Sequence, residues 1–255
     1  MSTTRSIALK APATRPCADA ALVLWGHGTG GGPGVLAVHA RRLAALKRFT
    51  QVRVACLRGA PRLAGVMAEL TAERVYLAPM LMADGFLVRT ALSAAISELG
   101  REAARLRVAP VLGRNPRLAE RLLEHGLAAA RDRRWAPESA RLLVIGHGTR
   151  RDRKSRATAF THAMEIANRG VFARVSAAFL EDRPTLAEAV AGDTSRLVAV
   201  GLFADAGRHG EDDVHRALSA LGRPYAYAGA IGRVPAIAGL VLEQLALADR
   251  LTEAV

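Results

Sequence analysis

The sequence predicts an α/β protein of two similar domains, each a mainly parallel four-stranded sheet flanked by helices, which face each other across a cleft. Three observations lead to this fold class. Blocks of sequence recur in the same order in two halves of the chain. Short apolar runs alternate with stretches of helical spacing, and these runs lack a polar face, as strands covered by helices on both sides do. The charged stretch 127–140 suits a connector, so we place the N-terminal repeat at residues 1–136 and the C-terminal repeat at residues 137–255.

The repeat rests on four pairs of matching blocks. The pairs are LVLWGHGTG (22–30) with LLVIGHGTR (142–150), VRVACLRGAPRLAGVMAEL (52–70) with VSAAFLEDRPTLAEAV (175–190), VYLAPMLMADG (75–85) with LVAVGLFADAG (197–207), and APVLGRNPRLAERLLEHG (109–126) with AGAIGRVPAIAGLVLEQL (228–245). Self-similarity of this kind indicates a duplicated domain.

Each predicted strand is a short apolar run flanked by glycine or proline. In chain order we expect strands at 21–25, 52–57, 74–79 and 108–112 in the first half, and at 142–146, 173–180, 196–202 and 225–230 in the second. A helix should follow each strand. The first of these stretches, GVLAVHARRLAALKRF, has apolar residues three and four positions apart, which is the spacing of an amphipathic helix.

The formal net charge is +13, and almost all of it lies in the first half. Residues 1–136 hold 21 Lys and Arg against 9 Asp and Glu, whereas residues 137–255 hold 15 against 14. A basic face attracts polyanions, whether nucleic acid, membrane or an acidic small molecule, although solvated helix faces rich in arginine give the same composition. Aromatic residues make up only 4% of the chain and no nucleic-acid-binding motif is present, so a nucleic-acid-binding protein is a distant alternative.

Other features bear on location. No segment approaches the roughly 20 uninterrupted apolar residues of a membrane span, and the N-terminus lacks the continuous apolar core of a signal peptide. Cys17 and Cys56 form neither a metal-site spacing nor a disulfide framework. We therefore expect a cytoplasmic protein that does not bind membranes.

Glycine-flanked histidines end the first strand of each half. His27 follows Gly26, and His147 follows Gly146. Ligands of such sheets bind beyond the carboxyl ends of the strands, so both corners are candidate sites. Thr149 can cap the helix that follows, whose N-terminus attracts anions. The stretch GHGTGGGPG lacks the spacing of a P-loop or a dinucleotide site, which excludes that interpretation.

A second histidine lies in a matching loop of the C-terminal half. His209 stands in GLFADAGRHGEDDVHRAL, after the third strand. If the first and third strands are neighbours, both imidazoles project into the same cleft, where they suit a first-row divalent metal ion in a labile site. Glu181 ends the second strand nearby. The acidic residues after His209 stabilise a helix N-terminus, and Asp213 can also orient an imidazole.

The first half lacks this constellation. Leu87 stands opposite His209, Ala91 opposite Asp213 and Arg58 opposite Glu181. We therefore interpret His27 as lining the cleft rather than binding metal. The remaining histidines are expected at surface or core positions of helices; they are His39, His125, His162 and His215.

The repeated GHGT corner, AFLEDRP, FADAGRHGEDD and LGRNP together resemble the sirohydrochlorin chelatase family, the small ATP-independent class II chelatases. The resemblance covers the chain from Ala21 to about Leu247. It implies insertion of a divalent metal, Co²⁺ in the first place and Fe²⁺ or Ni²⁺ as alternatives, into sirohydrochlorin or a related carboxylated tetrapyrrole, with release of two protons and without ATP. The metal ion is then a substrate, and the protein is a monomer or homodimer.

The resemblance also implies residue roles. The family's metal-binding histidines correspond to His147 and His209. Because histidine both binds metals and accepts protons near neutral pH, we expect these two residues to act as ligands and proton acceptors. Glu181 assists proton removal. Residues that contact the tetrapyrrole are then expected at Arg150, Arg151, Arg153, Thr149 and His27.

In some relatives an acidic residue of the N-terminal half completes the metal site. Only Asp84 stands near that position here, and it precedes Gly85 rather than following it. A carrier of tetrapyrrole or metal without turnover is therefore the alternative function.

Overall fold

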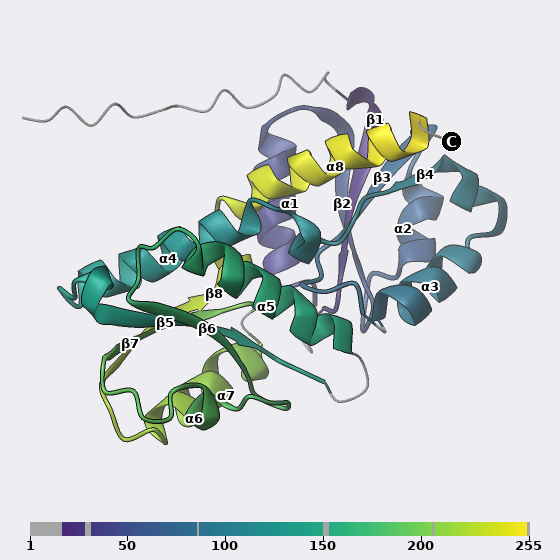
Figure 1. The fold of residues 1–255 in the computed structure, drawn as a ribbon. Helices are drawn as coiled ribbons and strands as arrows, with labels where there is room; N and C mark the ends of the chain where they lie inside the picture. Colours follow the sequence, from purple (N-terminus) through teal and green to yellow (C-terminus); the bar gives the residue numbers. More distant parts are fainter. Residues whose placement is uncertain (1–16, 29–31, 86, 150–152, 206, 254–255) are drawn as a thin grey trace, which may run out of the picture.

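The computed structural model describes residues 17–28, 32–85, 87–149, 153–205 and 207–253, and these form two four-stranded parallel sheets (Figure 1). The first sheet has the order β2-β1-β3-β4 and the second the order β6-β5-β7-β8. Their strands are β1 (Cys17–Gly26), β2 (Phe49–Cys56), β3 (Arg74–Pro79), β4 (Leu106–Val108), β5 (Ala140–Gly146), β6 (Arg174–Phe179), β7 (Arg196–Gly201) and β8 (Tyr225–Ala230). The predicted fold class is confirmed, including the duplication, since both sheets share one topology.

One strand prediction was wrong. The fourth strand was expected at 108–112, whereas β4 covers only Leu106–Val108. The ladder to β3 ends when Ala109 N–H donates to Leu77 O at 2.9 Å. Alternate residues of a parallel strand donate to the same neighbour, so Val111 would supply the next N–H toward β3. The buried residues Val111 and Leu112 lead into a 3₁₀ turn instead.

Helices follow the strands as expected. They are α1 (Val35–Ala45), α2 (Leu63–Glu69), α3 (Ser93–Ser97), α4 (Leu118–Asp132), α5 (Arg153–Ala167), α6 (Leu186–Ala189), α7 (Arg208–Ser219) and α8 (Ile237–Glu253). Shorter helical turns are η1 (Leu87–Leu92), η2 (Gly100–Arg105), η3 (Leu112–Arg114), η4 (Pro137–Ser139) and η5 (Ile231–Arg233). No helix among the residues described is long and apolar enough to cross a membrane.

Each central strand is buried on both faces, and its alternate residues join different cores. Leu22 and Leu24 of β1 belong to a core that also contains Leu142 and Val144 of β5, so this core is shared by the two halves. The intervening residues of β1 pack against α2 in a second core. Those of β5 pack against α6 and α7 in a third. Period-two alternation with both faces apolar explains why the strands were visible as continuous apolar runs.

The last helix of each half packs on the sheet of the other half. α4 contacts β7 and β8, while α8 contacts β3 and β4 and crosses the first sheet (Figure 1). Gln244 of α8 is buried, and its side-chain amide donates to Val111 O at 2.7 Å. The division between residues 136 and 137 stays a prediction. The exchange of α4 and α8 ties the two halves together wherever the boundary is drawn.

The Gly-Arg-x-Pro turns η3 and η5 have no room for a side chain at their glycine. Gly232 N–H donates to Phe203 O at 2.9 Å, and a Cβ on Gly232 would lie 2.0 Å from Ala204 O. Gly113 is in the same position, with Met82 O at 1.9 Å. The glycine shared by the two repeats therefore lets η3 and η5 pack directly on the segments that leave β3 and β7.

Gly232→Ala is expected to destabilise the protein by about 3 kcal/mol, because a backbone carbonyl cannot move aside as a side-chain tip can. Urea unfolding measures this loss as a lower midpoint at unchanged slope. Gly65→Ala in α2 is the matched control, since a Cβ added to Gly65 would have no neighbouring atom within 4 Å, and alanine favours a helix by about 0.5–1 kcal/mol. Equal midpoints for the two variants would contradict the packing argument.

Candidate functional site

The His147 corner is formed by a glycine turn at the carboxyl end of the central strand β5. Gly148 has φ +75°, and a Cβ there would lie 2.7 Å from the Asp182 Cβ. Only glycine meets both demands. The turn directs the chain away from the buried strand and leaves the His147 side chain 46% exposed.

Backbone hydrogen bonds place Glu181 beside His147. Leu180 N–H donates to Gly146 O at 3.2 Å, and Glu181 N–H donates to His147 O at 2.9 Å. The side chains follow, with His147 Nε2 and Glu181 Oε2 separated by 3.5 Å. Both side chains are half-exposed, so their attraction contributes less than about 1 kcal/mol. The paired loops, rather than this attraction, hold the imidazole and the carboxylate together.

The neighbouring carboxylate of Asp182 is engaged elsewhere. Its side chain is 11% exposed and lies 3.6 Å from Arg156 Nη1 of α5. It also accepts a hydrogen bond from Arg183 N–H at 2.7 Å. Of the two acidic residues on this loop, Glu181 is therefore the more accessible one.

A shared site for His147 and His209 requires the first and third strands of the C-terminal half to be neighbours. They are, because β5 lies between β6 and β7. His209 is the second residue of α7, which follows β7, so the sheet brings its loop to the edge where His147 lies. The side chains of His209 and Arg153 lie outside the described residues, as do Arg150 and Arg151 altogether. Their predicted roles stay predictions. Among the side chains that are described, no group of three or more His, Cys, Asp or Glu is arranged to hold a metal ion.

The remaining candidate residues, Thr149, Asp84 and Asp213, lie in or beside the loops that follow the strands. Thr149 is half-buried and directly follows the glycine turn. Asp84 lies 3.4 Å from Arg114 Nη1, and the corresponding arginine of the second half, Arg233, lies 2.9 Å from Glu211 Oε2. Asp213 pairs with Arg216 at 2.9 Å along α7. These ion pairs are largely exposed, so each contributes little to the stability of the fold.

The His27 corner repeats the backbone of the His147 corner. Leu57 N–H donates to Gly26 O at 2.8 Å, and Arg58 N–H donates to His27 O at 3.0 Å. His27 is exposed. The structure thus confirms that Arg58 occupies the position of Glu181. A cation, rather than a carboxylate, follows the first corner.

Two buried histidines bridge the halves, and sequence reasoning missed this role. His39 of α1 donates from Nε2 to Gly232 O at 2.7 Å, and His162 of α5 donates from Nε2 to Gly113 O at 2.8 Å. Both were expected on helices at surface or core positions, and both are in the core. Burial holds the pKa of His39 below its ordinary value. The usable signal was a histidine in the helix after each glycine corner, combined with the repeated Gly-Arg-x-Pro.

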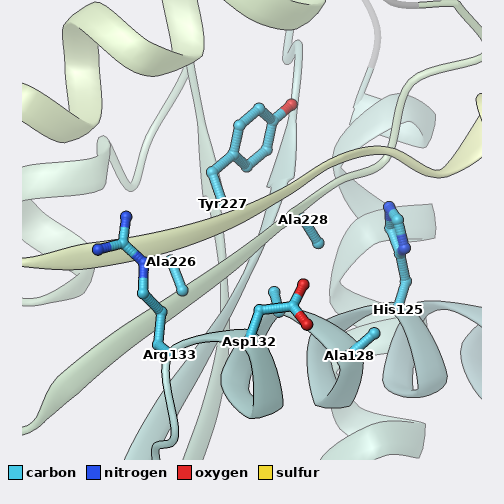
Figure 2. A pocket seen from close by; sticks show the side chains of 8 residues that line it. His125, Ala128, Asp132, Arg133, Ala226, Tyr227 and Ala228 are labelled. Atoms are coloured by element: carbon cyan, nitrogen blue, oxygen red, sulfur yellow. The ribbon is translucent and has the colours of Figure 1, made fainter.

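A pocket of about 250 Å³ lies between α4 and β8 (Figure 2). His125 and Asp132 of α4 face alanines of β8 across it. Burial holds the pKa of His125 below its ordinary value. None of the candidate site residues lines this pocket, and its volume is below the roughly 300–1,000 Å³ of sites for drug-sized ligands. We therefore do not place a tetrapyrrole there.

Comparisons with known proteins agree with the duplication. A family model described as CbiX matches residues 21–127 and 141–248. A curated relative, the probable sirohydrochlorin cobaltochelatase of Halobacterium salinarum, is 25% identical over 89% of this chain and 90% of its own length.

Two solved structures have the same fold. CbiX, described as the terminal enzyme for biosynthesis of siroheme in denitrifying bacteria, has a TM-score of 0.72 and 26% identity over 89% of this chain and 98% of that one. SirB from Bacillus subtilis with Fe³⁺ has a TM-score of 0.77 and 16% identity over 92% and 97%.

Proposed function

Because the chain belongs to the CbiX family, we propose that it inserts a divalent metal ion into sirohydrochlorin or a closely related carboxylated tetrapyrrole. The observation that carries this proposal is the pair of His147 and Glu181, an exposed imidazole and carboxylate 3.5 Å apart at the carboxyl end of the central strand. This edge is where ligands of open parallel sheets bind. The sirohydrochlorin cobaltochelatase relative from Halobacterium salinarum supports the same reaction class.

Metal insertion requires a ligand for the incoming ion and acceptors for two protons. The reaction converts the free macrocycle and M²⁺ into the metallated macrocycle and two H⁺, which leave the pyrrole nitrogens. A neutral imidazole binds first-row divalent metals well, so we assign His147 and His209 to the metal. An imidazole nitrogen that binds the ion cannot take a proton at the same time. As the ion passes to the macrocycle, the imidazole that it leaves can accept one pyrrole proton, and Glu181, in reach of the same face, accepts the other.

Binding of the macrocycle needs cations for its carboxylates. We assign this role to the arginines that follow His147, namely Arg150, Arg151 and Arg153, because arginine pairs bidentately with carboxylates. His27 and Thr149 complete the predicted contacts. The basic first half, with 21 Lys and Arg in residues 1–136, raises the local concentration of such an anion.

Imidazoles bind Co²⁺, Fe²⁺ and Ni²⁺ alike. We favour Co²⁺, with the other two as alternatives, because the Halobacterium salinarum relative is described as a probable cobaltochelatase. The deciding experiment is anaerobic incubation of the protein with sirohydrochlorin and each metal in turn, followed by the absorption change on metallation. We expect acceleration over the spontaneous reaction, greatest with Co²⁺. No acceleration with any metal would refute the enzymatic function, and tight tetrapyrrole or metal binding in that case would identify a carrier.

A further inference from the structure

The segment that carries His209 is held by the opposite half of the molecule. Residues 203–213 leave β7 and run into α7; we call them the His209 segment, of which residue 206 lies outside the described residues. The turn η5 rests on its start, because Gly232 N–H donates to Phe203 O at 2.9 Å and no side chain fits between Gly232 and Ala204. His39 of α1 in turn binds Gly232 O.

Helix α1 also contacts the His209 segment directly. Val35, the first residue of α1, donates its backbone N–H to Asp205 Oδ2 at 3.2 Å. The N-cap residue Gly34 makes no side-chain cap to this helix, and a carboxylate at a helix N-terminus is stabilising. Val35 and His39 are about one helical turn apart, so both contacts come from the N-terminal part of α1.

The hydrogen bond from His39 to Gly232 O is well suited to fixing the position of η5. The His39 side chain is fully buried, and a carbonyl oxygen can only accept a hydrogen bond, which fixes the proton of the ring on Nε2. Burial, which lowers the pKa of His39, favours the neutral imidazole in this bond. A third link, the Arg233–Glu211 pair at 2.9 Å, joins η5 to the first turn of α7.

The corresponding segment of the N-terminal half has only part of this arrangement. His162 binds Gly113 O there, and Gly113 N–H donates to Leu81 O at 3.0 Å. The repeat alignment, however, places Ala83 opposite Asp205, and alanine has no carboxylate for a helix N-terminus. The added contact is therefore found on the segment that carries a histidine and not on its counterpart with Leu87.

We propose that His39, on α1 of the opposite half, and Asp205, on the segment itself, are positioning residues that anchor the His209 segment to α1. The proposal rests on the proposed function for its catalytic consequence, but its structural consequence is measurable without any metal or tetrapyrrole.

The kinetic test compares His39→Leu and Asp205→Ala with the matched control His162→Leu, which removes the same bond in the other half. Loss of one partner of a buried hydrogen bond shifts a local equilibrium about tenfold. We expect the two test variants to lower kcat of Co²⁺ insertion about tenfold with KM for sirohydrochlorin changed less than twofold. His39→Gln, whose amide N–H reaches the Nε2 position, and Asp205→Asn, which keeps an acceptor oxygen, should restore kcat. His162→Leu should leave kcat within about twofold.

The second readout is amide hydrogen exchange of the protein alone. His39→Leu should raise exchange in residues 203–213 about tenfold, whereas His162→Leu should do so in residues 81–92. If the wild type does not metallate sirohydrochlorin, the proposed function fails and exchange still decides the positioning. Unchanged exchange in 203–213, or an equal effect of His162→Leu there, overturns the proposal. Should His39→Leu fail to fold, Asp205→Ala at a half-buried position gives the same two readouts.

Discussion

Replacement of His147 by alanine is expected to lower the rate of metal insertion at least about hundredfold, because it removes a metal ligand from the immediate vicinity of Glu181. The fold should not suffer. The His147 side chain is 46% exposed, and surface substitutions of this kind change stability by about 0.5 kcal/mol or less. Stopped-flow absorption of sirohydrochlorin gives the rate, and titration with Co²⁺ in the absence of tetrapyrrole gives the metal affinity. His209→Ala should behave alike in both measurements.

His27→Ala is the matched control, since it removes the same side chain from the same backbone turn. Arg58 follows that corner where Glu181 follows the other, so we expect Co²⁺ affinity to stay within about threefold of the wild type. The effect should fall on KM for the tetrapyrrole, because contacts made equally in the ground state and the transition state affect binding alone. If His27→Ala lost as much metal affinity as His147→Ala, the metal would be shared between the two halves and the C-terminal assignment would be wrong.

The elements predicted best from the sequence are those with a strong local signal. β3 and β8 were expected at 74–79 and 225–230 and are found there, because a strand buried between helices is a continuous apolar run bounded by turn residues. β4 gave no such signal. It has three residues, one of them the exposed Val108, and the apolar residues that follow serve a turn.

The sequence did not predict which sheet each helix packs against. The apolar positions of α4 and α8 show that one side of each helix is buried, but not against which sheet. The packing of α8 on β3 and β4 is fixed by contacts such as the one from Gln244 to Val111, 133 positions away in the chain. No local pattern of residues encodes a contact over that distance.

Part of the candidate site was also predictable from the sequence, and part was not. Gly146-His147-Gly148 was predictable because glycines beside a histidine at a strand end require a turn, which leaves the side chain exposed. Glu181 was expected near His147 because it ends the second strand of the same half, and the two side chains lie 3.5 Å apart. The contact of His39 with Gly232, 193 positions away in the chain, was missed, because only the comparison of the two repeats, and no local pattern, points to it. A buried histidine on a helix reads in sequence as an ordinary core residue.

Glu181→Gln is expected to lower kcat of metal insertion about hundredfold while Co²⁺ affinity stays within about threefold. Glutamine keeps the length of the side chain, and the backbone bond from residue 181 to His147 O does not depend on it. What is lost is the ability to accept a pyrrole proton, which a positioned base supplies at about 10²–10⁴-fold advantage. Single-turnover rates at saturating metal isolate this step from binding, and added acetate should restore part of the rate of the variant by replacing the missing base.

The control for Glu181→Gln is Glu188→Gln, a second glutamate on the chain that follows β6. Glu188 forms a capping box with Thr185 at the start of α6, and glutamine serves in that motif as well, so neither fold nor rate should change. A Glu181→Gln enzyme that kept kcat within about threefold of the wild type, with no response to acetate, would mean that the protons leave to water. Glu181 would then act only on the orientation of the His147 ring, and its variant would show the loss in metal affinity instead.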